Sequence, residues 1–357
     1  MKRILALTLT MVMMLSLLAG CGGTKKEEPA PDTSKTEQTP EQKPESSTSA
    51  ETKTLRLAWT VGYDEKHPYT VAAETFKSYV EEKTEGRIKV ELYAGGQLGG
   101  DAEMLEMLQM GTLDVAVTST PAIANFTDVL VGCDMPYIWK NDLGAMYSVL
   151  TESDTGRKLL DRLQEETGIV GVSFLYQPFR HIFTNKEIKS VSDMAGLKFR
   201  CMQTPVHQEI FSAMGMSPVA LAYNDIYSAM QQGTIDGFES DAVGAVTSKF
   251  YEVSKYMTVS AHFNNTMVLL MSDSAYSGVS AEDQAIMQEA GAAAAKASYD
   301  CSVERNDAAI QTLKDAGLTV NEIDMSTIYD AVQSVIEKYS SIPEVAELVA
   351  AAEAAVG

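Results

Sequence analysis

The sequence predicts an α/β fold in two domains, and three observations support this prediction. Strand-like and helix-like hydrophobic patterns alternate from residue 54 onward, a rhythm typical of layered α/β proteins. The 357-residue chain leaves about 300 residues after its first 53, which suffices for two domains of ordinary size. The stretch between Pro218 and Pro343 contains no proline and includes a pattern for one helix longer than a single domain is wide.

The chain begins with a pattern typical of an exported lipoprotein. Two basic residues precede an apolar run of 16 residues, Ile4 to Ala19. This run is shorter than the roughly 20 residues that cross a bilayer, and it suits the core of a signal peptide. It ends in "LAGC", which resembles a lipoprotein signal whose cysteine, Cys21, carries the lipid. An ordinary signal peptide with a chance cysteine is the alternative. We predict a signal peptide over residues 1–20 and an extracytoplasmic protein anchored by lipid to the outer face of the cytoplasmic membrane.

Residues 21–53 are predicted to form a disordered tether behind the lipid-bearing Cys21. The stretch from Gly22 to Lys53 carries four prolines and no aromatic or large aliphatic residue. Such a segment cannot bury enough apolar surface to offset the entropy lost on ordering. The folded part is therefore expected to begin at about residue 54.

Composition and missing motifs exclude several classes of protein. The formal net charge of −21 argues against a nucleic-acid partner, because an acidic surface repels phosphate backbones. Cys133, Cys201 and Cys301 are odd in number and widely spaced, so we assume no disulfide. The four histidines lie far apart, and the sequence has no G-x-S-x-G, H-E-x-x-H or C-x-x-C motif. We therefore predict no metal, no cofactor and no enzymatic activity.

The strands and helices are expected in a simple order. Residues 54–59 alternate as a strand, and the apolar stripe over residues 72–80 indicates an amphipathic helix that stops at Gly86. Residues 87–93 alternate as a second strand, and a helix follows over residues 102–110. Further strands are expected at residues 112–118, 168–176, 197–202 and 265–271.

The glycine-rich stretch "YAGGQLGGDAEML", residues 93–105, raises the question of a phosphate-binding loop. Gly95 and Gly100 have the Walker spacing, but Asp101 and Ala102 stand where that motif needs Lys and then Ser or Thr. We place Asp101 at the N-cap of the following helix, where its carboxylate would repel a phosphate. The glycines therefore indicate a tight turn, and no nucleotide site is expected.

The pattern after residue 280 predicts the long helix. Ser280 with Asp283 resembles a capping box, and Gly317 is a stop signal. As a single helix, the 36 residues from 281 to 316 would be about 54 Å long, which exceeds the ~35–40 Å width of a domain of about 150 residues. Either Gly291 breaks this helix or the helix ties two domains together, and we favour the second.

Arg200 is the candidate for binding an anion. In "LKFRC" Leu197 and Phe199 point to one face of the strand, so Arg200 points to the other. It stands near the carboxyl end of a strand, just before a helix predicted to begin at Thr204 and Pro205. Ligands bind at this edge of open α/β sheets, and a guanidinium there can hold a carboxylate through two parallel hydrogen bonds. The spacing alone leaves open a surface arginine paired with an acidic residue.

Four long stretches carry a resemblance to a known family. They are "EEKTEGRIKVELYAGGQLGGDAEMLEMLQMGTLDVAVTST", "FRHIFTNKEIKSVSDMAGLKFRCMQTPVHQEIFSAMGMSPV", "YNDIYSAMQQGTIDGFES" and "SKFYEVSKYM". Across residues 54–345 the chain resembles the DctP-type solute-binding subunits of TRAP (tripartite ATP-independent periplasmic) transporters. The resemblance implies a two-domain periplasmic-binding-protein-like (Venus-flytrap) fold with a cleft, crossover strands and a long domain-spanning helix. The domains it implies are domain I, residues 54–177 plus 266–305, and domain II, residues 178–265 plus 306–357.

The resemblance also implies a ligand-binding site. It assigns the ligand carboxylate to Arg200, with Arg180 of the "FRH" motif assisting. Tyr223 matches an aromatic wall position, Gln203 matches another ligand-facing position, and His262 matches a histidine found near the site.

One departure from the family pattern concerns the substrate. Where the family often reads "DGQEN", this chain reads "DGFES". Ser240 therefore replaces an asparagine that hydrogen-bonds the ligand in many members, and Asp241 follows it. A short hydroxyl in place of an amide leaves room for water or for a bulkier polar ligand.

The function implied by the resemblance is capture of a small organic acid by a lipid-anchored monomer, for delivery to the small and large TRAP membrane subunits. C4-dicarboxylates, uronates and other sugar acids, and 2-oxo acids remain alternatives for the ligand. A sensor that presents its liganded form to a receptor kinase is the second hypothesis. An extracellular lyase or hydrolase acting on acidic sugars is the third, and only the pair Ser240 and Asp241 supports it.

Overall fold

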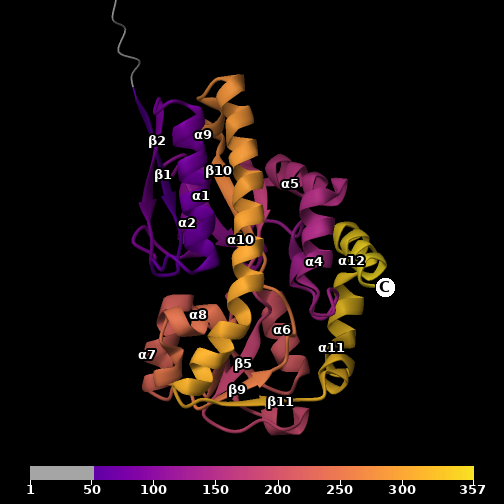
Figure 1. Ribbon diagram of the computed structural model, residues 1–357. Coiled ribbons are helices and arrows are strands. Elements are labelled where there is room, and N and C mark those ends of the chain that lie inside the picture. The colour runs from indigo at the N-terminus through magenta and orange to yellow at the C-terminus, as the bar shows by residue number, and fades with distance from the viewer. Residues whose placement is uncertain (1–51) are drawn as a thin grey trace, which may run out of the picture. The chain divides into compact units, whose positions relative to one another are not determined.

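The structure, a computed structural model, describes residues 52–357 (Figure 1). The predicted signal peptide, Cys21 and all but the end of the predicted tether lie outside the described residues. Within residues 52–357, no helix is long and apolar enough to span a membrane. Cys133, Cys201 and Cys301 are buried free thiols.

Two mixed sheets organise the described residues, and both belong to one compact unit, residues 50–357. The first sheet has the strand order β2-β1-β3-β10-β4, with β1 parallel to β2 and β3, and with β10 antiparallel to β3 and β4. Its strands are β1 (Lys53–Ala58), β2 (Ile88–Tyr93), β3 (Val115–Ser119), β4 (Ile169–Leu175) and β10 (Met267–Ser272). Each overlaps a strand that the hydrophobic pattern predicts. We call this sheet and the helices on it the first lobe.

The second sheet has the order β11-β9-β5-β8-β6-β7 and, with its helices, forms the second lobe. Its strands are β5 (His181–Thr184), β6 (Lys198–Cys201), β7 (Ser217–Ala220), β8 (Gly237–Ser240), β9 (Tyr256–Val259) and β11 (Thr319–Glu322). The sequence pattern predicts β6 alone among them. These strands have only four residues each, which is too short for an alternating pattern to stand out from its surroundings.

The helices connect and cover these sheets. They are α1 (Pro68–Lys83), α2 (Asp101–Gln109), α3 (Thr120–Ile123), α4 (Leu143–Tyr147), α5 (Asp154–Thr167), α6 (Pro205–Ala213), α7 (Ile226–Gln231), α8 (Ala242–Thr247), α9 (Asp273–Ser277), α10 (Ala281–Asp315), α11 (Met325–Tyr339) and α12 (Pro343–Val356). Short 3₁₀ or π turns lie at Val131–Asp134, Ser148–Glu152, Val191–Met194, Tyr223–Asp225 and Phe250–Glu252. Because helices cover the first sheet, β3, β4 and β10 are buried along their whole length.

The long helix α10 is continuous, as predicted. The Ser280 hydroxyl accepts a hydrogen bond from the Asp283 N–H at 3.1 Å, which satisfies one of the free donors at the helix start. The helix ends just before Gly317, whose φ of 98° is readily adopted by glycine. Gly291 lies within the helix and does not break it. Figure 1 shows α10 running beside α1 on the first lobe and on to α8 on the second, and residues of these elements are in contact.

Two segments cross side by side from one lobe to the other. Gln177 follows β4 and Asn265 precedes β10; the Gln177 amide donates to the Asn265 carbonyl at 2.7 Å. In the same pair of segments the Asn264 amide donates to the Gln177 carbonyl at 2.6 Å, and the Arg180 N–H donates to the Phe263 carbonyl at 2.9 Å. These are crossover strands of the kind that the family resemblance implies.

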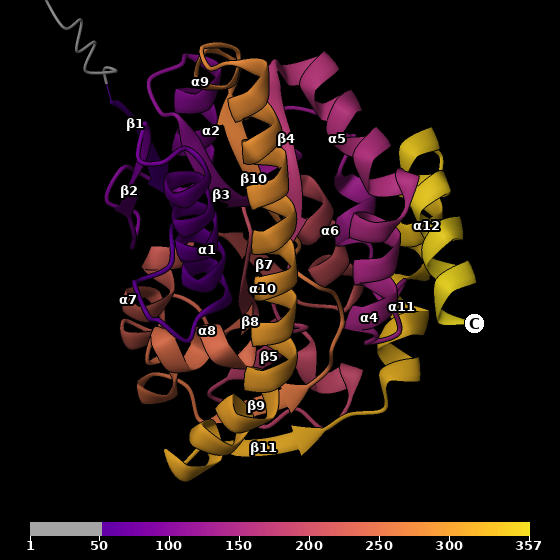
Figure 2. The same ribbon diagram turned by 45° about the horizontal axis from the view of Figure 1, so that its top comes forward.

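The domain boundaries themselves stay a prediction. The proposed boundaries 177/178 and 265/266 fall in the two crossover segments. The C-terminal block is divided: α11 contacts α6 of the second lobe, whereas α12 contacts α4 and α5 next to the first sheet (Figure 2). The placement of α12 therefore differs from the assignment of residues 306–357 as a whole to domain II.

One local prediction is wrong. Gly100, not Asp101, is the N-cap of α2, and Asp101 is the first helical residue. Its carboxylate accepts a hydrogen bond from the Ser119 hydroxyl at 2.8 Å. The acidic side chain is thereby held at the carboxyl end of β3, beside the cavity described next.

Candidate functional site

A cavity lies where the carboxyl ends of strands from both sheets meet. Its wall includes residues that directly follow β1, β6, β7 and β8, the last residue of β3, and the start of α2. The crossover segments add Gln177, Arg180 and Asn265. Ligands bind outside the carboxyl ends of strands in open α/β sheets, so the topology itself places a binding site here.

The structure brings five of the seven predicted ligand residues to this cavity. Those that line it are Arg180, Arg200, Gln203, Tyr223 and Asp241. Arg200 follows Phe199 on β6 and points to the opposite face, as the strand alternation predicts. Arg200 is buried, so the alternative of a surface arginine is wrong; its side chain lines the cavity and is also paired with a buried carboxylate.

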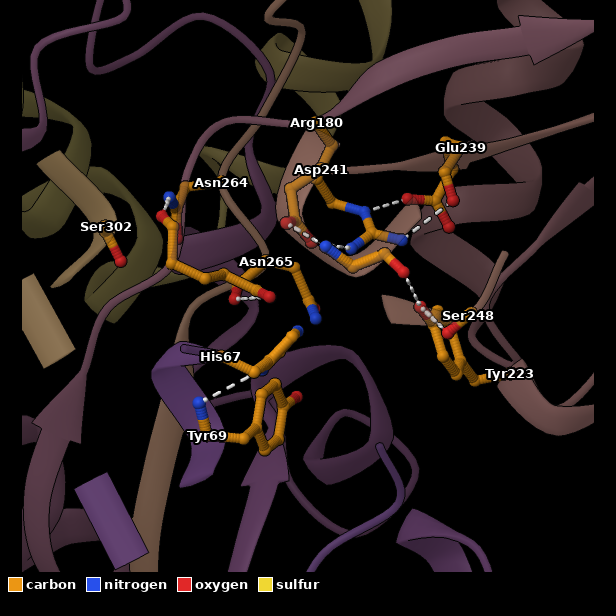
Figure 3. A network of polar contacts seen from close by, with 12 residues as sticks. His67, Tyr69, Arg180, Tyr223, Glu239, Asp241, Ser248, Asn264, Asn265 and Ser302 are labelled. Atoms are coloured by element: carbon orange, nitrogen blue, oxygen red, sulfur yellow. Dashed lines mark hydrogen bonds and ion pairs between the residues drawn. The ribbon is translucent and has the colours of Figure 1, made fainter. Parts of the chain in front are cut away.

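That carboxylate belongs to Glu239 on β8, which the sequence reasoning missed. Its side chain is fully buried and lies between the two arginines. Arg200 donates to one carboxylate oxygen at 2.8 Å and to the Leu221 carbonyl at 2.9 Å. Arg180 donates to the other carboxylate oxygen, and its Nη2 donates to the Glu239 carbonyl at 2.8 Å (Figure 3). The sequence does contain one indication of Glu239: the glutamate stands in a short stretch of otherwise uncharged residues. A carboxylate buried there needs a cationic partner.

Burial and ion pairing act in opposite directions on the two guanidinium groups. For Arg180, burial disfavours the charge, but Glu239 and Asp241 outweigh it and raise the pKa. For Arg200, burial prevails over the attraction of Glu239 and lowers the pKa. Arginine remains charged in proteins across the physiological range. Two fixed positive charges therefore reach the wall of the cavity.

Asp241 and Tyr223 are held by α8, Asp241 at the start of the helix and Tyr223 at its end. Asp241 is the N-cap of that helix, and one carboxylate oxygen accepts from the Gly244 N–H at 2.8 Å. The other lies 3.7 Å from Nη1 of Arg180. The Tyr223 hydroxyl lies 2.9 Å from the Ser248 hydroxyl. Burial raises the pKa of Tyr223 to about 12, so the phenol stays neutral and can donate a hydrogen bond.

The first lobe contributes His67, Tyr69 and Asp101, which the sequence reasoning did not assign to the site. Nδ1 of His67 accepts from the Tyr69 N–H at 3.2 Å. Burial lowers the pKa of His67, so the ring is neutral and its proton lies on Nε2. Burial raises the pKa of Asp101, although the Ser119 hydroxyl donates a hydrogen bond to its Oδ2. Figure 3 shows His67 and Tyr69 on the side of the site opposite Arg180 and Asp241.

Two predicted residues do not line the cavity. Ser240 is fully buried on β8 and is not part of the cavity lining; its hydroxyl lies behind the wall, next to the Tyr223 hydroxyl. His262 is fully buried against Phe211 and Phe263, and its Nδ1 lies 2.8 Å from the Ser260 hydroxyl. Its place is explained by packing: the ring completes an aromatic cluster behind the crossover segment.

Comparison with known proteins agrees with this geometry. The family model described as bacterial extracellular solute-binding protein, family 7 (DctP), matches residues 61–342. The C4-dicarboxylate-binding periplasmic protein DctP of Rhodobacter capsulatus is 32% identical over 256 residues, which cover 71% of this chain and 75% of that protein.

Solved structures give the same result. A TRAP periplasmic solute-binding protein from Sulfitobacter sp. NAS-14.1 with bound β-D-galacturonate superposes with a TM-score of 0.79 at 28% identity, covering 85% of this chain and 100% of that one. A TRAP periplasmic solute-binding protein from Polaromonas sp. JS666 bound to D-erythronate has a TM-score of 0.80 at 29% identity, covering 85% of this chain and 98% of that one.

Proposed function

We propose a function for the cavity from one premise: the chain belongs to the DctP family of bacterial extracellular solute-binding proteins, family 7. The cavity binds a small organic acid anion, and Arg200 and Arg180 hold its carboxylate. One observation carries this proposal. Two buried guanidinium groups, 3% and 2% exposed, end at a cavity formed by the carboxyl ends of strands from both sheets. Charge-assisted hydrogen bonds to a carboxylate are strongest in such a desolvated place.

The relatives support an acid as the ligand and leave its class open. The Sulfitobacter and Polaromonas proteins hold a uronate and a sugar acid, whereas the Rhodobacter protein is named for C4-dicarboxylates. All of these ligands carry a carboxylate that two arginines can hold. Gln203, Tyr223 and Asp241 would then contact the rest of the ligand, since each lines the cavity. For Ser240 and His262, which lie behind the wall, we propose only a supporting role.

The proposed setting is extracytoplasmic, without catalysis. In this proposal a lipid on Cys21 anchors the monomer, the segment between Cys21 and β1 acts as a tether, and the liganded protein delivers its acid to TRAP membrane subunits. The family description as extracellular and solute-binding supports this setting, as does the TRAP designation of the two solved structures.

Replacing Arg200 by lysine tests the proposal. Lysine keeps the positive charge, but its single ammonium group cannot make all three contacts at once: the pair with Glu239, the hydrogen bond to the Leu221 carbonyl and the grip on a ligand carboxylate. We expect Arg200→Lys to weaken binding at least tenfold, about 1.4 kcal/mol, in calorimetry with galacturonate, erythronate and succinate. Arg162→Lys, on the exposed face of α5, is the control and should bind as the unchanged protein does.

Two outcomes would contradict the proposal. One is that the unchanged protein binds none of the acids in this panel or in a wider organic-acid screen by thermal shift. A ligand at 100 times its dissociation constant adds about 2.7 kcal/mol of stability, so binding would be visible there. The other is that a folded Arg200→Lys variant, checked by its melting temperature, binds with unchanged affinity.

A further inference from the structure

The charges around the cavity separate the classes of acid that the proposed function leaves open. We propose that the site takes a monocarboxylate bearing hydroxyl groups and rejects dicarboxylates, with Asp101 as the residue that enforces this choice. This inference rests on the proposed function, because it assumes that the arginines hold one carboxylate of the ligand.

The first step is the charge balance of the wall. Arg180 and Arg200 are the cationic side chains among the described residues that line the cavity. Both are already paired with Glu239, and Arg180 also lies 3.7 Å from Asp241. Asp101 adds a further carboxylate to the wall. Two positive charges thus face three carboxylates before any ligand enters.

This balance accommodates one ligand carboxylate and not two. The first carboxylate can take the guanidinium N–H groups that are not used by Glu239, since each guanidinium has five. A second carboxylate, at the far end of the ligand, would find no cation of its own in this wall. It would lie against Asp101 or Asp241, and like charges that close repel strongly in a partly desolvated site.

The second step concerns polar atoms that lack partners within the described residues. Nε2 of His67 is buried without a hydrogen-bond partner, and the residue is only 1% exposed. Oδ1 of Asp101 is also buried and unpartnered. Both residues line the cavity from the first lobe, whereas the arginines line it from the crossover and the second lobe.

Hydroxyl groups match this pair of atoms. Because His67 Nε2 carries the proton, it needs an acceptor, and the Asp101 oxygen needs a donor. A hydroxyl supplies both functions, whereas an ionised carboxylate has no hydrogen to donate to Asp101. Buried polar atoms left unpartnered weaken binding. An acid with hydroxyl groups can therefore provide hydrogen-bond partners for both His67 Nε2 and the Asp101 oxygen, whereas a second carboxylate can provide one only for His67.

Calorimetry on the purified protein at pH 8 with matched acids tests this inference. The four-carbon set is erythronate (one carboxylate, three hydroxyls), tartrate (two carboxylates, two hydroxyls) and butyrate (one carboxylate, no hydroxyl). Galactonate and galactarate form an open-chain six-carbon pair, in which galactarate has a second carboxylate in place of the terminal CH2OH group. We expect the hydroxylated monocarboxylate of at least one size to bind at least tenfold more tightly than its dicarboxylate counterpart and than butyrate.

Asp101→Asn keeps the shape of the side chain and removes its charge, so the preference over the dicarboxylate should fall at least fivefold. Asp154→Asn is the matched control, because Asp154 is also the first residue of a helix, α5, but is exposed and does not line this cavity. It should leave the preference unchanged.

The outcomes distinguish this inference from the proposed function. Equal or tighter binding of tartrate or galactarate by the unchanged protein would overturn the inference and leave organic-acid binding intact. The same preference in Asp101→Asn as in Asp154→Asn would overturn the role of Asp101. Binding of none of these acids would contradict the proposed function itself.

Discussion

Glu239 joins the two arginines of the cavity wall. Its buried carboxylate holds both arginines, with one oxygen facing each. This arrangement orients the two guanidinium groups before any ligand arrives, so less side-chain entropy is lost on binding. It also withdraws part of their charge from the ligand. If the cavity binds an anion as proposed, this arrangement makes the attraction directional and reduces its strength.

Replacing Glu239 by glutamine should destabilise the protein strongly. The change leaves two buried positive charges without the carboxylate that lies between them, and removing one partner of a buried ion pair costs about 3–5 kcal/mol. We expect a loss of about 3 kcal/mol in the free energy of unfolding, measured by urea denaturation. Glu165→Gln, on an exposed part of α5, should change it by less than about 0.5 kcal/mol. A loss below about 1 kcal/mol for Glu239→Gln would show that the arginines do not need this carboxylate.

Helix α10 contacts both lobes, and one glycine allows it to pack closely on the first sheet. A Cβ added at Gly291 would lie 2.5 Å from Cγ1 of Val172 and 3.2 Å from Cβ of Ser173, both on β4. The absence of a side chain therefore allows the close approach of helix and strand. The glycine serves packing, and neighbouring helix hydrogen bonds keep the helix continuous.

Gly291→Ala tests this close approach. In an open helix the change would stabilise by about 1 kcal/mol, but the clash with β4 should cost about 1–3 kcal/mol and leave a net loss in the free energy of unfolding. Ala292→Gly at the neighbouring exposed position is the control and should lose about 1 kcal/mol through helix propensity alone. A net gain for Gly291→Ala in chemical denaturation would mean that α10 does not pack closely on β4.

The stability of the whole molecule should fall in mild acid. All four histidines, His67, His181, His207 and His262, are buried, and burial lowers the pKa of each. For His181 the value is about 4. Between about pH 6.5, where an exposed histidine titrates, and about pH 4, the unfolded chain binds protons that the folded chain does not. Stability therefore falls as the pH falls.

Two buried aspartates oppose this trend. Burial raises the pKa of Asp134 and of Asp101, so each carboxyl takes up its proton at a higher pH in the folded chain than in the unfolded chain. Their contribution grows as the pH falls, but two groups oppose four. We expect the melting temperature to drop steadily from pH 7.5 to pH 5, and His181→Asn to show a shallower drop. A constant or rising melting temperature over this range would contradict the argument.

Local patterns in the sequence predict much of this molecule. The buried strands β3, β4 and β10 read as apolar runs, Ser280 and Gly317 delimit α10, and alternation in β6 turns Arg200 away from Phe199. Each of these features depends on residues that are close together in the sequence, so each can be predicted from the sequence alone. The family resemblance adds Arg180, Gln203, Tyr223 and Asp241, all of which line the cavity.

The partners of these residues depend on the folded chain. Glu239 meets Arg180 across 59 positions, and His67 and Asp101 join the same wall from the other sheet. The strand order and the crossover segments bring these distant residues together. Hydrophobic periodicity along the chain does not predict such contacts. The same cause places His262 in an aromatic cluster behind the wall and Asp101 within the wall. Hydrophobic patterns depend on residues close together in the sequence. The charge balance of a binding site depends on charged residues from distant parts of the chain, which only the fold brings together.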